Sequence, residues 1–407
     1  MTTLAELCEF IIDCEHRTAP TVTTGGHPLI RTPDVGVGRL NIEGAQRVSE
    51  DTYRAWTKRA IPRAGDLILA REAPVGNVGI VRPGVHPALG QRTVLIRSRS
   101  DVLDPHYLNY LMSAPELRGW MESVSSGATV PHLNVADIRS MELPPLPRLG
   151  AQRKIAAILS AYDDLIENND RRIRLLEEMA LRVYREWFVD FRYPGHESVP
   201  LVDSELGPIP KGWSLRPLFD VADITFGFPF RSELFNSEMG VPVIRIRDIP
   251  TGESGTLTTE VPGDTYRVED GDILVGMDGE FHMGRWSAGE AWLNQRVARF
   301  RVASDTICRY TLFLALERPI SDWNQAIVGT TVAHLGKRHL ELIKIPTPPI
   351  SLGTQLSAVL DPIFDLEIRL RKATRNLRAT RDLLLPRLIS GEIDVTHLDI
   401  TLSEDSA

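Results

Sequence analysis

The sequence has few cysteines, no long apolar run and no metal-type spacing. Its three cysteines, Cys8, Cys14 and Cys308, are an odd number, which argues against a disulfide framework and a zinc cluster. No apolar stretch approaches the roughly 20 residues that cross a bilayer. The first ten residues, MTTLAELCEF, do not have the pattern of a secretory signal. We therefore expect a cytoplasmic protein with free thiols.

Recognisable catalytic motifs are also missing. Gly36-Val37-Gly38 lacks the third glycine of a dinucleotide-binding loop, and Gly336-Lys337 lacks the first glycine and the final Ser/Thr of a phosphate loop. We find no amino-methyltransferase tetrad, no nuclease-like carboxylate and lysine pattern, and no helical histidine pair. The sequence therefore predicts a binding protein with no catalytic residues, no bound cofactor and no metal.

Lysine is scarce as well. Of the 46 basic residues, 40 are arginine and 6 are lysine, while the formal net charge is −8 and the last 17 residues carry five acids without a base. Arginine suits phosphates and guanine edges better than lysine does. A high-GC genome would give the same bias, so the charge neither supports nor excludes a nucleic-acid partner.

What is present is an internal repeat. The octet SGATVPHL (126–133) returns as VGTTVAHL (328–335), LGQR (89–92) returns as LNQR (293–296), and AGDLIL (64–69) returns as DGDILV (270–275). The spacing between the copies drifts only from 206 to 202 residues. Each copy contains short apolar runs opened by Gly-Asp turns, followed by helical patterns. We therefore predict one α+β domain type, with a mixed and largely antiparallel sheet, present twice.

A long heptad pattern follows each copy. Its seam positions are Ile155, Leu159, Ile166, Asn169, Ile173 and Leu176 in the first segment, and Ile363, Leu366, Leu370, Leu377 and Leu384 in the second. Such helices also form homodimers or pack on a domain, but two seams in one chain pair most simply with each other. We predict an antiparallel coiled coil in a pseudo-twofold arrangement. In the second segment, Asp361-Pro362 has the pattern of a helix start, and Pro386 is expected to stop or kink the helix.

These patterns predict the order of the parts along the chain. The predicted boundaries are a first repeat domain at 1–148, a first long helix at 149–192, a linker at 193–213, a second repeat domain at 214–350, a second long helix at 351–391 and an acidic tail at 392–407.

Four segments, taken in this order, resemble the specificity subunit of type I restriction–modification systems. They are LILAREAPVGNVGIV (67–81), WFVDFRYPG (187–195), SELGPIPKGW (204–213) and LPRLISGEIDV (385–395). The resemblance covers essentially the whole chain. It implies two target-recognition domains separated by long helices, in a non-catalytic subunit that reads one half of a bipartite DNA target with each domain.

The same resemblance implies the partners. Two modification subunits, which bind S-adenosylmethionine and methylate adenine N6, would dock on the specificity subunit, and restriction subunits that translocate and cut DNA would join them. Two alternatives stay open: a self-contained DNA-modifying enzyme with an unrecognised site, and a scaffold or decoy that does not bind DNA. One departure is that GMDGEFHMGRW (276–286) stands where the first domain has AREAPVGNVGI (70–80), so base contacts do not transfer between the domains.

Candidate DNA contacts fall into two groups. Repeated residues are expected to position phosphates or to form the scaffold, because base-reading residues should differ between half-sites; they are Gln91, Arg92, Thr129, His132, Gln295, Arg296, Thr331 and His334. Residues in the differing parts are candidates for reading bases; they are Arg17, Arg31, Arg54, Lys58, Arg71, Arg231, Arg245, Arg247, Lys337 and Arg338. Arg71 is expected to present an exposed guanidinium to guanine or a phosphate, the alternative being a surface salt bridge with Glu72 or another acid. Arg371, Arg375 and Arg378 share one helix face, which either is solvated or binds phosphates or a modification subunit.

Overall fold

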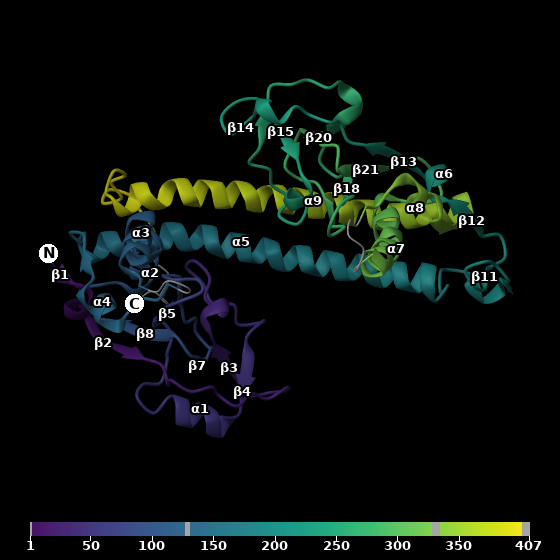
Figure 1. Ribbon diagram of the computed structural model, residues 1–407. Coiled ribbons are helices and arrows are strands. Elements are labelled where there is room, and N and C mark those ends of the chain that lie inside the picture. The colour runs from purple at the N-terminus through teal and green to yellow at the C-terminus, as the bar shows by residue number, and fades with distance from the viewer. Residues whose placement is uncertain (1, 127–130, 328–333, 401–407) are drawn as a thin grey trace. The chain divides into compact units, whose positions relative to one another are not determined.

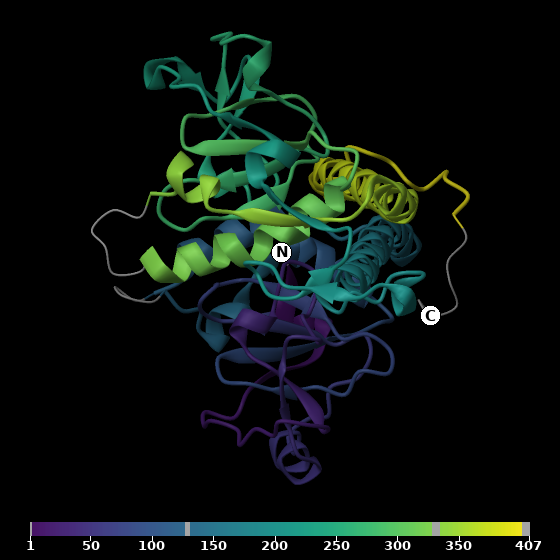
Figure 2. The same cartoon turned by 90° about the vertical axis from the view of Figure 1, so that its right-hand side faces the viewer.

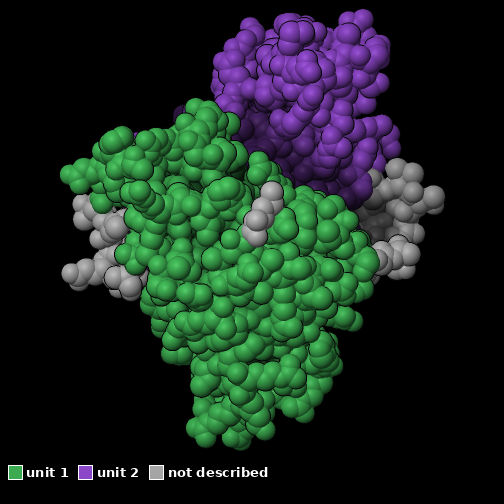
Figure 3. Space-filling view, turned by 90° about the vertical axis from the view of Figure 1, so that its left-hand side faces the viewer, with its two compact units in different colours: residues 1–165, 377–407 green, residues 166–376 purple. Residues whose placement is uncertain are grey.

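The computed structural model describes residues 2–126, 131–327 and 334–400. It divides into two compact units, one formed by residues 1–165 with 377–407 and the other by residues 166–376 (Figure 3). Each unit contains one repeat domain and part of both long helices (Figure 1). Within the described ranges, no helix is long and apolar enough to span a membrane.

The first repeat domain is built on two sheets. Four antiparallel strands form the order β2-β8-β5-β6, and three strands form β4-β3-β7, in which β3 and β7 are parallel. The bounds are β2 Cys8–Asp13, β3 His27–Ile30, β4 Gln46–Val48, β5 Leu67–Ala70, β6 Val78–Ile80, β7 Ala88–Leu89 and β8 Thr93–Ser98. The helices are α1 Glu50–Trp56, α2 Pro105–Ser113, α3 Pro115–Val124 and α4 Val135–Ser140, and a short pair joins β1 Thr2–Thr3 to β9 Glu142–Leu143.

The second repeat domain has the same plan with a larger second sheet. Its four-stranded order is β13-β21-β18-β19, and its five-stranded order is β14-β16-β15-β20-β17, in which β15 and β20 are parallel. The bounds are β13 Ala222–Phe226, β14 Phe235–Asn236, β15 Val241–Ile244, β16 Leu257–Thr258, β17 Arg267–Val268, β18 Ile273–Gly276, β19 Met283–Arg285, β20 Ala291–Leu293 and β21 Val297–Val302. The remaining elements are β12 Ser214–Pro217, which pairs with β22 Lys344–Thr347, and the helices α6 Leu218–Val221, α7 Arg309–Ile327 and α8 Lys337–Glu341.

The repeat seen in the sequence is therefore a repeat of topology. The Gly-Asp turns explain why: Asp66 accepts two hydrogen bonds from Arg97, both of 2.7 Å, and Asp272 accepts 2.6 and 2.8 Å bonds from Arg301. In the four-stranded sheets, each pair ties the start of β5 or β18 to the neighbouring strand, β8 or β21. The predicted α+β class with two similar domains is confirmed.

The first long helix, α5, spans Leu149–Tyr184 and continues as one π-helical turn to Val189. All six predicted seam residues face the interior: five are buried, including Asn169, and Leu176 is half-buried. The second long helix, α9 (Ile350–Ile389), runs antiparallel to α5 within each unit (Figures 1 and 2). In the first unit Asp163 pairs with Arg381 at 2.6 Å, and in the second Glu177 pairs with Arg371 at 2.6 Å.

The seam of α9 is broader than predicted. Leu370 is buried, whereas Ile363, Leu366, Leu377 and Leu384 are half-buried, and Val359, which continued the predicted stepping, is 47% exposed. The fully buried stripe lies about one position further along, at Leu356, Leu360, Phe364 and Glu367. The three apolar members of that stripe join the core of the second domain. Helix α9 therefore packs against both α5 and the core of the second domain, so its buried residues do not form a single heptad seam.

The predicted helix start at Asp361-Pro362 is wrong, and the helix does not stop at Pro386, whereas a kink at Pro386 stays a prediction. The helix begins at Ile350, runs through Asp361 and Pro362, contains Pro386 and ends at Ile389. Packing before Pro362 accounts for this, since Leu352, Leu356 and Leu360 are buried. Arg309 of α7 also binds Asp361 at 3.5 Å and Asp365 at 2.7 Å, which fixes the turns on both sides of the proline.

The predicted linker at 193–213 lies within the second unit and contributes to its core. It contains β10 Leu201–Val202 paired with β11 Ile209–Pro210. Tyr193, Ile209 and Trp213 are buried, and Phe188 meets Trp213 edge-on with ring centroids 5.1 Å apart. The segment is therefore an ordered connection. The domain boundaries stay predictions, because the compact units divide both long helices.

Candidate nucleic-acid interface

The repeated residues meet at the same end of the four-stranded sheet in each domain. The N–H of Arg71 donates to the carbonyl of Arg92, and the N–H of Leu133 donates to Arg71, each at 2.9 Å. In the second domain the N–H of Met277 donates to Arg296 at 2.9 Å, and the N–H of Leu335 donates to Met277 at 2.7 Å. We call these segments the repeated frame: residues 71–72, 91–92 and 132–133 in one domain, and 277–278, 295–296 and 334–335 in the other.

An arginine and an acid pair in each copy of the repeated frame. Arg92 lies 3.4 Å from Glu72, and Arg296 lies 3.0 Å from Asp278, with both arginines exposed. His334 also contacts Asp278, at 2.5 Å through Nδ1. Each exposed guanidinium keeps donors free for an anion, because one carboxylate oxygen does not use all five N–H groups.

The other repeated candidates sit beside these pairs. Gln91 and Gln295 are exposed next to the two arginines, and His132 is half-buried and pairs through its backbone with Glu72. Thr129 and Thr331 lie outside the described residues. The repeated frame thus places an exposed guanidinium beside a carboxylate in each domain, which suits contacts to phosphates.

Arg71 contradicts its prediction, since it is only 8% exposed. Its Nη1 donates to both oxygens of Asp13, at 3.1 and 3.0 Å, and its Nε donates to the carbonyl of Leu133 at 2.7 Å. The alternative, a surface salt bridge with Glu72 or another acid, is correct in that Arg71 pairs with an acid, which is Asp13, but the pair is buried rather than on the surface. The sequence does not reveal Asp13 as the partner, because Arg71 and Asp13 lie far apart in the chain, at the ends of two different strands.

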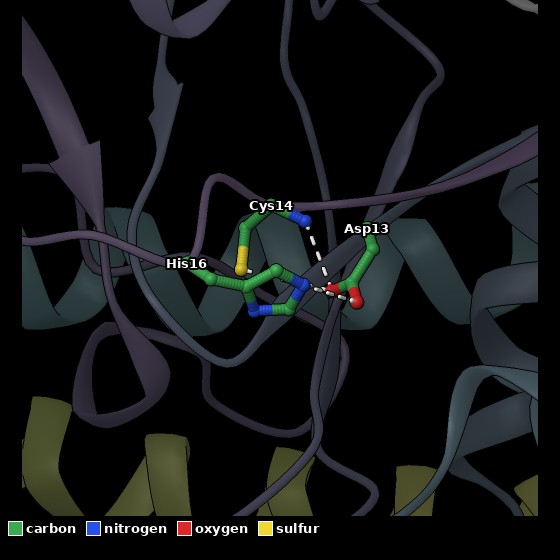
Figure 4. Close-up of side chains that lie close together, drawn as sticks. All are labelled: Asp13, Cys14 and His16. Carbon is green, nitrogen blue, oxygen red and sulfur yellow. Dashed lines mark hydrogen bonds and ion pairs between the residues drawn. The ribbon is translucent and has the colours of Figure 1, made fainter.

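Asp13 also belongs to a group of three potential metal ligands. Its carboxylate lies near Cys14 and His16, with the ligand atoms all within 4.8 Å of one another (Figure 4). The carboxylate charge is already matched by Arg71. Burial raises the pKa of the Cys14 thiol, so the thiolate that binds a metal is disfavoured. The group fits a structural role better than a metal site.

Three candidates of the first domain gather at helix α1. Ser49 caps this helix by accepting from the N–H of Thr52 at 3.2 Å. Arg54 is exposed and binds Glu50 at 2.8 Å, Arg17 stacks over the Trp56 ring at 4.3 Å, and Lys58 is exposed just beyond the helix. In the described part of the other domain, no matching α-helix lies beside the second sheet. This cationic group is therefore a feature of the first domain alone among the described residues.

The candidates of the second domain divide between two places. Arg231 binds Glu260 at 3.4 Å, Arg245 stacks over Phe235 at 4.6 Å, and Arg247 is exposed with Asp248 at 3.8 Å. All three flank the five-stranded sheet. Lys337 and Arg338 are exposed on α8 instead, directly after the octet. The structure therefore separates α8 from the set around the second sheet.

Arg31 and Arg245 turn out to occupy equivalent positions. The N–H of Arg31 donates to Asp34 at 3.0 Å, and the N–H of Arg245 donates to Asp248 at 2.8 Å, each at the start of a single 3-10 turn. The sequence carried the signal, because both stretches read Ile-Arg-X-X-Asp, at 30–34 and 244–248. The prediction that both residues lie in the differing parts is therefore wrong, because the same turn occurs in both domains.

The basic face of α9 is not a solvated face. Arg371 is half-buried between two glutamates, and Arg375 is half-buried with its Nη2 donating to the carbonyl of Ser287. Burial lowers the pKa of Arg375 below its usual value. These two side chains attach the helix to the second domain, and they are not available to phosphates.

Comparisons with known proteins point to one family. The family model described as type I restriction modification DNA specificity domain matches residues 23–178 and 210–379. The MjaIX specificity subunit of Methanocaldococcus jannaschii is 27% identical over 372 residues, 87% of this chain and 83% of that protein. The EcoBI specificity subunit of Escherichia coli is 32% identical over 186 residues, 44% of this chain and 39% of that protein. The crystal structure of a type I S subunit from M. genitalium shares the fold, with a TM-score of 0.64 at 15% identity and 95% coverage of both chains.

Proposed function

This chain belongs to the type I restriction–modification DNA specificity family, and from that premise we propose that it reads a bipartite DNA target, one half with each repeat domain. It does so as the non-catalytic subunit of a complex. Adenine-N6 methylation and DNA cleavage belong to its partners: two modification subunits that bind S-adenosylmethionine, and restriction subunits. The paired helices set the distance between the two half-sites and offer the docking surface for the modification subunits. The complex acts on chromosomal DNA in the cytoplasm.

One observation carries this proposal: the repeated frame is kept in two domains whose second sheets differ. Arg92 and Arg296 stand at the same place beside an acid, which fits a shared grip on phosphates. The second sheet has three strands and helix α1 in one domain and five strands in the other. Two unlike half-sites require different base-reading side chains, and the two domains would carry these on the same repeated frame.

The experiment that tests the proposal measures DNA methylation by the modification subunit with and without this chain. We expect methylation of one bipartite adenine-containing motif only when both are present, with the motif identified by long-read sequencing of the methylated DNA. Methylation by this chain alone would refute the non-catalytic assignment and support the enzyme alternative. Unchanged methylation without the chain would refute its role in recognition and leave the scaffold alternative.

A further inference from the structure

A group of charges with a buried centre joins the second domain to both long helices. We call it the charge cluster: Glu177 of α5, Glu367 and Arg371 of α9, and Arg285 of β19 with Tyr310 of α7. Glu367 is 0% exposed, and the side chain of Arg285 is 6% exposed. Two arginines and two glutamates make the cluster neutral. All five residues lie within the second unit.

Arg285 is the bridge between the domain and the helices. Its Nη2 donates to Glu177 at 2.6 Å and to Glu367 at 2.7 Å, so one nitrogen of a sheet residue binds both helices at once. Its guanidinium also lies 4.1 Å from the centre of the Phe313 ring, which covers it from the domain side. Arginine suits this place because its planar group presents several donors in a fixed geometry.

Arg371 and Tyr310 complete the arrangement. Arg371 donates to Glu367 at 2.7 Å and to Glu177 at 2.6 Å, and the hydroxyl of Tyr310 donates to the other oxygen of Glu367. Burial holds the pKa of Tyr310 far above its usual value, so the hydroxyl stays a donor. Every charged group in the cluster therefore has a fixed partner on another element or on the next helical turn.

The first unit has a smaller version of this contact. The hydroxyl of Tyr110, in α2, donates to Asp163 of α5 at 2.6 Å, and Arg381 of α9 donates to the other oxygen of Asp163 at 2.6 Å. A tyrosine of the domain, a carboxylate of one helix and an arginine of the other meet again. Apolar packing alone tolerates sliding, whereas fully paired buried charges favour one geometry.

We propose that Arg285, Tyr310 and Glu367 are positioning residues that fix the second domain in one orientation on the helix pair, and that the complex thereby accepts a single spacer length between half-sites. This inference rests on the proposed function. According to this proposal, the charge cluster makes the complex discriminate between spacer lengths that differ by one base pair. The paired helices set only the approximate distance between the half-sites.

The test compares methylation of DNA substrates whose half-sites are separated by the wild-type spacer or by one base pair more or less. The main variant, Arg285→Met with Glu367→Met, removes one charge of each sign and leaves the Glu177–Arg371 pair. We expect it to keep both half-site sequences and to lose about tenfold of its preference for the wild-type spacer, because it removes several charge-assisted hydrogen bonds. Tyr310→Phe keeps all charges and should shift the preference less, in the same direction.

The matched control is Arg301→Met. It removes the pair with Asp272; among the described residues, the ion-pair partners of Arg301 are Asp272 and Glu269, both inside the same domain. The variant should therefore lower the methylation rate equally at all spacers. The inference is overturned if the cluster variants behave like this control or keep the wild-type preference. If the wild-type complex methylates no bipartite motif, the proposed function fails instead, and the two failures are therefore distinct.

Discussion

Arg71 holds three distant segments of the first domain together. It directly follows β5, binds Asp13 at the end of β2 and binds the carbonyl of Leu133, the last residue of the octet. In the second domain, Met277 takes the equivalent backbone position. Its side chain is buried and carries no charge. A buried ion pair and an apolar contact of similar volume are often close in stability. The backbone hydrogen bonds were therefore kept while the side-chain chemistry changed.

We expect Arg71→Met to lower the free energy of unfolding by about 2–4 kcal/mol, because Asp13 and the Leu133 carbonyl lose their donor. Chemical denaturation of the chain with its partners absent measures the loss. The double variant Arg71→Met with Asp13→Leu copies the apolar solution of the second domain and should recover at least half of it. If Arg71→Met instead has wild-type stability but no longer binds DNA, Arg71 is a DNA contact after all.

The two long helices show where prediction from sequence succeeds and where it stops. In α5 the heptad spacing predicts positions that the structure buries, including Asn169, with Leu176 half-buried. In α9 the residues that join the domain core, Leu356, Leu360 and Phe364, form a different stripe from the predicted one. The repeat and the strand runs were readable from local patterns. Strand order and the partner of Arg71 were not, because they depend on contacts between residues far apart in the chain.

Pro362 in the middle of α9 gives a prediction at the scale of the element. Proline removes one backbone hydrogen bond and costs roughly 3 kcal/mol relative to alanine inside a helix. Since Pro362 is exposed, Pro362→Ala should raise the free energy of unfolding by about 1–3 kcal/mol without disturbing the core. Thermal unfolding followed by circular dichroism measures this, with the exposed Val359→Ala as the control that should change little. A lower melting temperature for Pro362→Ala would show that the proline supports a required bend.

At the scale of the whole molecule, we expect the features that both domains share to have a different function from the features that occur in only one of them. The repeated frame and the Ile-Arg-X-X-Asp turns occur in both domains, so they suit contacts that every sequence offers. Helix α1 with Arg17, Arg54 and Lys58 occurs in the first domain only, within the described residues. Specific readout needs side chains that differ where the bases differ. We therefore expect the residues at α1 to control one half-site.

Arg17→Ala combined with Lys58→Ala tests this division. In the assembled complex, the pair should relax or weaken recognition of one half-site by about 10- to 100-fold, since each good base contact discriminates by about 1–3 kcal/mol. The other half-site should keep its sequence, because the second domain is unaltered. Methylated motifs mapped by long-read sequencing give both halves from one measurement. Arg99→Ala is the matched control, an exposed arginine just after β8 that pairs with Asp101, and it should leave both halves unchanged. Equal weakening at both half-sites, or the same result for the control, would mean that the α1 cations contribute only charge.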